Sequence, residues 1–314
     1  MKAFITGING FAGSFLAEAL LKSGRQVTGS VQPGTPLDNL AAIEAQLKLI
    51  PLDLNDSSAL EKFIAAEAPD EIYHLAAVSS VKDSLDDPRK CFIVNVLGSL
   101  NLLEAARHHL PKTTVVLVTS SEIYGEALSE KVLTSESSPI IPKSPYAVSK
   151  AALDHLGRVY ANNFGLKVVI ARPFSHIGPR QTSVFFIPSV ASQIVELEKT
   201  GGGEIKVGNI EMDRDFTDVR DVVEAYVLLA EKGKSGEAYN ICRGETRRLK
   251  ELVDRLIALA RVPIKVTIDS ERCRPSDLTS MKIDSRKLKA IGWQPIIPID
   301  TTLADILAYW RKRV

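Results

Sequence analysis

Short runs of apolar and β-branched residues alternate with amphipathic stretches through the first half of the chain. The runs occupy residues 2–6, 26–30, 47–52, 71–75, 115–119 and 167–172. Apolar residues recur at helical spacing over residues 55–66, 91–109 and 146–164. Strands joined by helical segments favour right-handed crossovers that cover both faces of a parallel sheet. The sequence therefore predicts an α/β fold with a doubly wound parallel sheet, whose ligands bind at the carboxyl ends of the strands.

Three glycines follow the first predicted strand and open a helical pattern over residues 11–22. Gly7, Gly10 and Gly13 form G-x-x-G-x-x-G. Residues without side chains let the backbone turn sharply and approach a pyrophosphate, whose charge the free amides of a helix N-terminus stabilise. An isolated match would often be only a tight turn, but the position at the start of a βαβ unit favours a Rossmann-type dinucleotide site.

Prolines and glycines divide the chain into shorter elements after Pro173. We expect residues 1–172 to form the dinucleotide-binding domain. Residues 173–214 and 243–314 are expected to form mainly a smaller α+β substrate lobe. Because residues 221–231 have helical periodicity, we expect residues 215–242 to return to the first domain.

The charges of the 314-residue chain nearly cancel, with 39 basic against 38 acidic residues. A net charge of +1 supplies no global field for nucleic acid or an anionic membrane, and no apolar segment is long enough to cross a bilayer. Cys91, Cys242 and Cys273 lie far apart without a C-x-x-C pair, which indicates neither a zinc site nor a disulfide framework. The acids and histidines do not cluster at ligand spacing, so we expect no metal. We expect a cytoplasmic protein with neither a nucleic-acid nor a membrane partner.

The second predicted strand ends without the acid that would accept from the adenosine ribose of NAD. That absence favours NADP, or the use of both NADP and NAD. Ser30 is the candidate for a bond to a 2′-phosphate, while Arg25 and Lys48 are weaker candidates that are more simply surface charges. Asp53, after the third predicted strand, is either near the adenine edge or a helix N-cap or turn acid, and the sequence leaves both open.

A tyrosine and a lysine stand four residues apart in a predicted helix, in P-Y-A-V-S-K at residues 145–150. Tyr146 and Lys150 therefore lie on one helix face, and a nearby ammonium favours the phenolate of the tyrosine. Upstream, T-S-S-E at residues 119–122 brings three hydroxyls and an acid to the carboxyl end of a buried strand. Separately these are an amphipathic helix and a hydroxyl-rich turn. Together they indicate a catalytic site.

Taken together, the motifs resemble the extended short-chain dehydrogenase/reductases over nearly the whole chain. The segments that carry the resemblance are G-I-N-G-F-A-G (7–13), H-L-A-A (74–77), N-V-L-G-S-L-N-L-L-E-A (95–105), T-S-S-E-I-Y-G (119–125), P-Y-A-V-S-K (145–150), R-P-F-S-H-I-G-P-R-Q (172–181), R-D-F-T-D-V-R-D (214–221) and R-P-S-D-L (274–278). This order is typical of members that process nucleotide-diphosphate sugars.

The resemblance implies a role for each residue of the catalytic group. Tyr146 would exchange a proton with the sugar C4 oxygen, and Ser120 would hydrogen-bond the same oxygen. Lys150 would hold the nicotinamide ribose and lower the pKa of Tyr146. Asn95 would order the adjoining helix and an active-site water, or would be merely structural, and these readings stand near parity.

The resemblance also implies which residues contact the coenzyme and the substrate. The expected coenzyme contacts are Gly7, Gly10, Phe11, Ala12, Gly13, Ser30, Asp53, Leu54, Leu75, Ala76, Ala77, Asn95, Tyr146, Lys150 and Pro173. The expected contacts with a GDP-sugar are Ser121, Ser175, Arg180, Arg214 and Arg274. Guanidinium groups suit a diphosphate, although any one of these arginines can instead be a surface ion-pair residue. Relatives often have asparagine at Ser175, and we do not expect His176 to be a catalytic base.

Two reactions fit the catalytic group. R-P-F-S-H-I-G-P-R-Q is most similar to members that reduce a GDP-4-keto-6-deoxy-hexose at C4 to GDP-D-rhamnose with NAD(P)H, and this reductase is our preferred reading. The alternative is a GDP-mannose 4,6-dehydratase, or another nucleotide-sugar dehydratase or epimerase, in which Glu122 acts as the base. A non-catalytic NADP-binding sensor is a third reading, which intact Ser120, Tyr146 and Lys150 disfavour.

The predicted helices over residues 91–109 and 146–164 have broad apolar faces. The resemblance implies that they pair with a second copy of the chain as a four-helix bundle. Alternatively, the sheet and the lobe of one chain cover them. We expect a homodimer.

Overall fold

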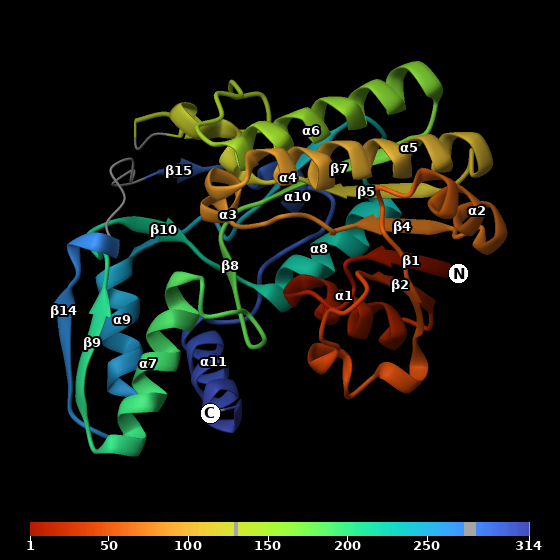
Figure 1. The fold of residues 1–314 in the computed structure, drawn as a ribbon. Helices are drawn as coiled ribbons and strands as arrows, with labels where there is room; N and C mark the ends of the chain where they lie inside the picture. Colours follow the sequence, from red (N-terminus) through yellow and green to blue (C-terminus); the bar gives the residue numbers. More distant parts are fainter. Residues whose placement is uncertain (129–130, 273–280, 314) are drawn as a thin grey trace.

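The computed structural model describes residues 1–128, 131–272 and 281–313 (Figure 1). Seven parallel strands form one sheet in the order β12-β7-β5-β4-β1-β2-β3. The strands are β1 (Lys2–Thr6), β2 (Gln26–Val31), β3 (Lys48–Pro51), β4 (Glu71–His74), β5 (Thr114–Val118), β7 (Lys167–Pro173) and β12 (Ala238–Ile241). The predicted α/β class with a doubly wound parallel sheet is confirmed.

Helices cover both faces of the sheet, as its strands require because most are buried on both sides. One face carries α1 (Phe11–Lys22) and α8 (Val219–Lys232). The other carries α2 (Ser57–Glu67), α5 (Gly98–His109) and α6 (Pro145–Phe164). Strand β12 pairs with β7, so part of the chain after residue 214 lies within the main sheet.

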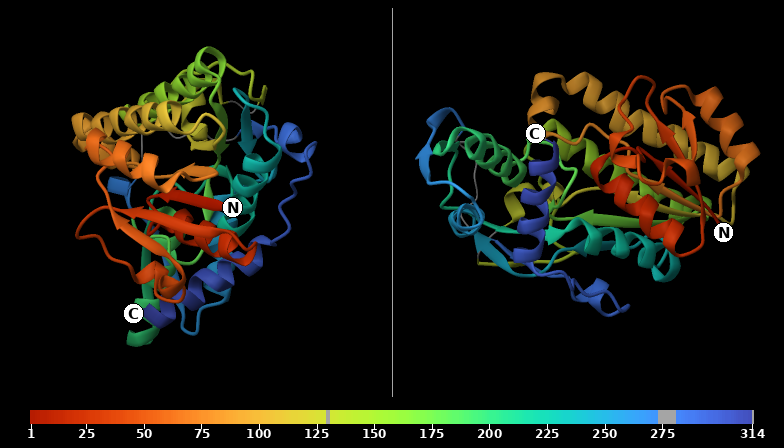
Figure 2. Two further views of the ribbon diagram at one scale, coloured as in Figure 1. Left: turned by 90° about the vertical axis from the view of Figure 1, so that its right-hand side faces the viewer. Right: turned by 90° about the horizontal axis from the view of Figure 1, so that it is seen from below.

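A smaller body lies beyond the carboxyl ends of the strands (Figures 1 and 2). It has its own apolar core, formed by α7 (Phe186–Thr200), α9 (Leu249–Ala258), α11 (Ile299–Arg313), β9 (Gly203–Val207) and β14 (Ile264–Ile268). Strands β9 and β14 pair in parallel. We call this body the lobe.

Short elements connect the sheet and the lobe. The paired strands are β8 (His176–Ile177) with β11 (Thr217–Asp218), β10 (Asp213–Asp215) with β13 (Thr246–Arg248), and β6 (Leu133–Thr134) with β15 (Lys282–Ile283). The remaining short turns of helix are η1 (Asp38–Leu40), η2 (Glu44–Gln46), α3 (Val81–Asp86), η4 (Ser121–Ala127), η5 (Ser270–Arg272) and α10 (Arg286–Lys289).

The predicted helix over residues 91–109 is longer and is interrupted. It begins as α4 (Pro88–Phe92), widens to a π-helical turn, η3 (Ile93–Leu97), and continues as α5. Asp87 caps the start of α4 by accepting from the Lys90 amide at 2.9 Å. Within the described part of the chain, no helix is both long and apolar enough to cross a membrane.

Candidate active site

The glycine-rich turn between β1 and α1 is shaped by close backbone approach. Gly7 has a φ of 69°, and a Cβ there would lie 3.0 Å from the Cα of Ala76. A Cβ on Gly13 would lie 2.3 Å from the Gly7 carbonyl oxygen, so only glycine fits. Gly10 precedes α1 without a side-chain cap, which leaves the first amides of the helix, at Phe11 and Ala12, available to an anion. These features fit the pyrophosphate of a dinucleotide.

The loop after β4 forms the neighbouring wall of this site. Thr6 Oγ1 accepts from the amides of Leu75 and Ala76, each at 3.1 Å. The Asn95 side chain accepts from the Val78 amide at 2.8 Å and donates to the Val78 carbonyl at 3.1 Å. Asn95 thereby fastens the loop to the π-helical turn.

Asn95 also reaches the catalytic helix, because its Nδ2 donates to Ser149 Oγ at 2.9 Å. Ser149 Oγ donates in turn to the Tyr146 carbonyl at 2.7 Å. Asn95 therefore orders the helices and the loop, while its role toward an active-site water stays a prediction.

Ser30 and Asp53, the residues expected near the adenosine of the coenzyme, lie on β2 and just after β3. Ser30 is buried, and its carbonyl accepts from the Gly7 and Ile8 amides at 3.2 and 3.3 Å. Asp53 is exposed, and its Oδ1 accepts from the backbone and side chain of Asn55 at 2.9 and 3.0 Å. Asp53 is therefore a turn acid in this structure, while Asp56 is the cap of α2. Leu54, between them, is buried in the core under α2.

The two basic residues considered for the coenzyme, Arg25 and Lys48, lie away from the glycine-rich turn. Arg25 pairs with Glu71 and Glu231, each at 2.8 Å, at the amino ends of the strands. Lys48 pairs with Glu67. Because the glycine-rich turn lies at the carboxyl ends, both residues stabilise the opposite edge of the sheet.

The catalytic group lies where β5 and α6 meet. Ser144 caps α6 by accepting from the Ala147 amide at 3.1 Å, and Pro145 occupies its first turn. This places Tyr146 at the start of the helix, buried, with its side chain close enough to Ser120 for that hydroxyl to act on its pKa. Lys150, one turn later and also buried, donates from Nζ to the Val118 carbonyl at 2.8 Å. Ser120, Tyr146 and Lys150 are thus brought together at the carboxyl end of β5.

Burial shifts the proton equilibria of this group in opposite directions. It raises the pKa of Tyr146 to about 12, with the Ser120 hydrogen bond acting against it and the Glu122 carboxylate adding to it. It lowers the pKa of Lys150 to about 8. Desolvation of the phenolate therefore dominates the pKa of Tyr146 in this structure, and the lowering expected from Lys150 stays a prediction.

Glu122 and Ser121 occupy the first turn of η4. The Glu122 amide donates to Ser120 Oγ at 3.2 Å, and the side chain of Glu122 is exposed beside the site. Its charge acts on Tyr146. Ser121 is buried. Pro173 ends β7 at the same edge.

The residues expected at the substrate are not gathered at one point. Ser175 is exposed between β7 and β8, and its carbonyl accepts from the Thr217 amide at 3.0 Å. Arg214 lies on β10 and donates to the Asp213 carbonyl at 2.8 Å. Arg274 lies outside the described residues. Arg180 contacts α1, where it pairs with Glu18 at 2.5 Å.

His176 is held by local contacts. Its Nδ1 donates to the Phe174 carbonyl at 3.0 Å, and burial lowers its pKa. Its ring stacks on Phe11, with centroids 5.7 Å apart. A histidine held in this way is not poised as a catalytic base.

The family model described as GDP-mannose 4,6 dehydratase matches residues 4–306. The chain belongs to the extended short-chain dehydrogenase/reductases that act on nucleotide sugars. It is accordingly an NAD(P)-dependent enzyme of nucleotide-sugar modification.

Three full-length comparisons within this family are informative. The chain is 33% identical to a GDP-6-deoxy-D-mannose reductase of Pseudomonas aeruginosa, over 100% of this chain and 98% of the reductase. The structure of RMD from Pseudomonas aeruginosa complexed with NADPH is 32% identical, with a TM-score of 0.84 over 100% and 99% of the two chains. A UDP-glucose 4-epimerase of Thermus thermophilus in complex with NAD is 30% identical, with a TM-score of 0.85 over the whole of both. Reductase, dehydratase and epimerase chemistry therefore all occur among similar members of the family.

One basic residue near the expected substrate contacts, Arg247, is not among the residues that the sequence predicts for the site. Arg247 lies directly opposite Arg214 in the antiparallel pair β10–β13, and Glu251 and Glu245 neutralise it at 3.2 and 3.6 Å. Arg247 is brought near Arg214 by the register of the two paired strands, and this register cannot be inferred from the sequence.

Proposed function

We propose that this protein reduces the C4 keto group of a GDP-4-keto-6-deoxy-hexose with NAD(P)H and so forms GDP-D-rhamnose. The observation that carries the proposal is the joint burial of Ser120, Tyr146 and Lys150 at one strand end. The full-length similarity to a GDP-6-deoxy-D-mannose reductase supports the choice of substrate.

The proposed chemistry uses the protonated form of Tyr146. A pKa of about 12 keeps its hydroxyl protonated near neutral pH, so it can donate to the sugar C4 oxygen as negative charge develops there. Ser120 donates a second hydrogen bond to the same oxygen, and the Lys150 ammonium stabilises its charge. A bound reduced nicotinamide supplies the hydride to C4.

The site also supports a second candidate reaction. Glu122 is exposed next to Tyr146, where a carboxylate can remove a proton from the sugar. The matching family model carries the description of a GDP-mannose 4,6 dehydratase. Under this alternative, Glu122 is the base of dehydration, whereas in the reductase it is only a polar neighbour of the substrate.

A pair of assays separates the reactions. Purified protein is given GDP-4-keto-6-deoxy-mannose with NADPH or NADH, and in parallel GDP-mannose, with products identified by NMR. We expect NAD(P)H oxidation and GDP-D-rhamnose from the first sample only. Loss of water from GDP-mannose, abolished in Glu122→Gln, would instead support the dehydratase. Binding of coenzyme without turnover of either sugar would support the sensor.

The catalytic assignment predicts the behaviour of one conservative variant. Tyr146→Phe removes the proton donor and leaves the ring, so we expect reduction to fall by about 10²-fold or more. GDP binding, measured by calorimetry, should be retained. Turnover close to that of the wild type would contradict the role of Tyr146.

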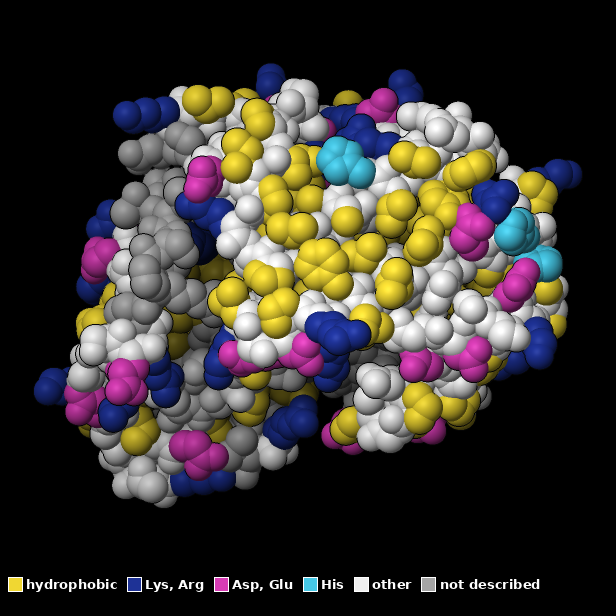
Figure 3. All heavy atoms as spheres, turned by 45° about the horizontal axis from the view of Figure 1, so that its top comes forward, with side chains coloured by type: hydrophobic (Ala, Val, Ile, Leu, Met, Phe, Trp, Pro, Cys, Tyr) yellow, Lys and Arg dark blue, Asp and Glu magenta, His cyan; other side chains and the backbone are white. Residues whose placement is uncertain are grey.

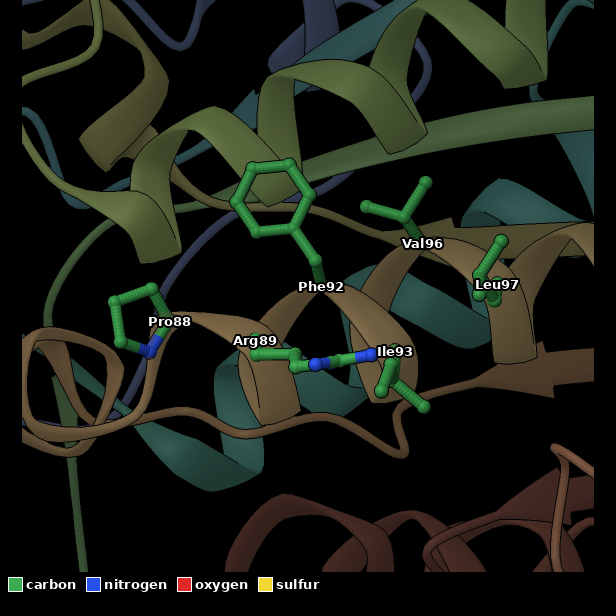
Figure 4. A pocket seen from close by; sticks show the side chains of 6 residues that line it. All are labelled: Pro88, Arg89, Phe92, Ile93, Val96 and Leu97. Carbon is green, nitrogen blue, oxygen red and sulfur yellow. The ribbon is translucent and has the colours of Figure 1, made fainter.

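We also propose that the enzyme is a homodimer. Figure 3 shows apolar side chains gathered over the helices at the top of Figure 1. The large exposed ones on α4, η3 and α6 are Phe92, Ile93, Leu97, Val148, Val159 and Phe164. Six residues from Pro88 to Leu97 line a shallow apolar hollow on this face (Figure 4). Contiguous exposed apolar surface of this kind favours pairing with a second copy through a four-helix bundle.

A further inference from the structure

Arg180 makes three side-chain contacts with α1. Nη2 pairs with Glu18 Oε1 at 2.5 Å, and Nη1 donates to Ser14 Oγ at 3.2 Å. The guanidinium also lies over the ring of Phe15, 4.4 Å from its centroid. Both terminal nitrogens and one face of the group are therefore engaged with the coenzyme-binding helix.

Arg180 adopts a backbone conformation that its side chain does not favour. Its φ of 72° lies in the left-handed region, which is strained for a residue other than glycine. A charge-assisted hydrogen bond and a cation–π contact can offset that strain. The backbone is therefore held in place by what the side chain contacts.

The same stretch touches α1 at a second place. His176 stacks on Phe11, and a Cβ on Gly178 would lie 3.5 Å from the Phe11 ring. Phe11 and the three residues bound by Arg180 follow helical spacing, so they lie on one face of α1. Residues 176–180 thus run along the helix whose first turn is placed to bind the pyrophosphate.

Residues 176–180 also connect to the lobe, which is the part of the chain expected to bind the substrate. Strand β8 pairs with β11, and the chain continues from Arg180 into α7 of the lobe core. Ser175, expected at the substrate, stands one residue before β8. The contacts of Arg180 therefore join the coenzyme helix directly to the entrance of the lobe.

We infer that Arg180 is a positioning residue, a latch that couples coenzyme binding at α1 to nucleotide binding by the lobe. Each ligand orders one side of the latch, so the second ligand to bind meets a site that is already ordered. Such coupling is reciprocal, and its usual size is about 5–150-fold in affinity. The inference rests on the proposed use of a nucleotide sugar, but not on the identity of its base.

The competing role for Arg180 is a direct contact with the substrate diphosphate. The two roles make opposite predictions for Glu18→Gln. If Arg180 binds the diphosphate, loss of Glu18 frees the guanidinium and leaves nucleotide affinity unchanged or stronger. If Arg180 is a latch, loss of Glu18 weakens the coupling as much as loss of Arg180 does.

The test is a double-mutant cycle with Arg180→Gln, Glu18→Gln and the double variant. Nucleotide Kd is measured by calorimetry with GDP, UDP and dTDP as probes, with and without saturating NADPH. We expect NADPH to tighten nucleotide binding by about 5-fold or more in the wild type. Each single variant should reduce this factor towards one, and the double variant should reduce it no further.

Two further variants keep the cycle interpretable. Arg180→Gly accepts the left-handed backbone without strain, so a loss of coupling there is due to the side chain. Arg255→Gln removes another ion-paired arginine of the lobe, bound to Asp300 and Glu251, and should leave the coupling unchanged.

Each remaining outcome has a defined meaning. Binding of UDP or dTDP in place of GDP would contradict the proposed substrate, and the cycle would then be read with that nucleotide. A wild type without coupling for any nucleotide would overturn the latch. So would an Arg180→Gln variant that weakens nucleotide binding equally with and without NADPH while Glu18→Gln has no effect.

Discussion

At the scale of single residues, the proposed catalytic group assigns proton donation to Tyr146 and charge stabilisation to Lys150. Tyr146 holds its proton far above neutral pH, whereas burial brings the pKa of Lys150 to about 8. The lysine is therefore charged below about pH 8 and neutral above it. Of the three catalytic residues, Lys150 is the one that changes charge between neutral and moderately alkaline pH.

A pH profile of reduction follows from this difference. We expect kcat to be level near neutrality and to fall above about pH 8, approaching about tenfold for each pH unit, as the ammonium is lost. In Lys150→Arg the charge persists, so the alkaline fall should disappear even if the rate is lower. The check is kcat under saturating coenzyme and substrate; an unchanged alkaline fall in Lys150→Arg would assign it to another group.

At the scale of elements, α6 is held to the sheet by a buried ion pair on its catalytic face. Asp154 lies one turn after Lys150, and its carboxylate accepts from Nε and Nη2 of Arg172 on β7 at 2.7 and 2.8 Å. Both side chains are almost fully buried. Arg172 also donates to the hydroxyl of Tyr124 at 2.8 Å, which ties η4 to the same point. The position of the helix, and so of Tyr146, depends on this pair.

Removing the carboxylate should destabilise the fold strongly. Asp154→Asn leaves the Arg172 charge buried without compensation, so we expect the free energy of unfolding to fall by about 3–5 kcal/mol. Arg158→Ala is the matched control, since Arg158 contacts the same carboxylate at 3.2 Å from a half-buried position and should cost about 1 kcal/mol or less. Urea denaturation followed by circular dichroism measures both; equal losses would contradict the central role of Arg172.

The elements that could be predicted from the sequence are those with strong local signals. The six runs of the first half became strands of the sheet, because each is apolar and short. Strand β12 was not identified as a strand, since its four residues carry no flanking pattern, and its place beside β7 is a long-range pairing. The contacts of Arg180 could not be predicted from the sequence either. The motif identifies Arg180 as a candidate substrate contact, but only the fold shows that its side chain pairs with Glu18.

At the scale of the whole molecule, the exposed apolar face over α4, η3 and α6 is the reason that we expect a homodimer. Leu97 on η3 is 51% exposed and Val159 on α6 is 42% exposed. A charge placed there would be buried without a partner in a dimer but would be harmless in a monomer. We therefore expect Leu97→Glu to convert a dimer into a monomer with unchanged circular dichroism, as measured by light scattering.

A matched substitution controls for charge alone. Ile296 is 77% exposed but lies on the C-terminal stretch, away from this face. Ile296→Glu should leave the molar mass of the wild type unchanged. A wild type that is already monomeric would contradict the proposed dimer, whatever the two variants show.

The late arrival of α8 and β12 bears on how the chain is made. During synthesis, the first six strands of the sheet emerge well before residues 219–241. Until then the edge of β7 has no partner, and the apolar residues of α1 that pack beside α8 stay uncovered. Unpaired edges and bare apolar faces are what make partly made chains aggregate. Because the main sheet cannot be completed before residues 219–241 emerge, we expect ribosome-bound intermediates of this chain to depend on chaperones.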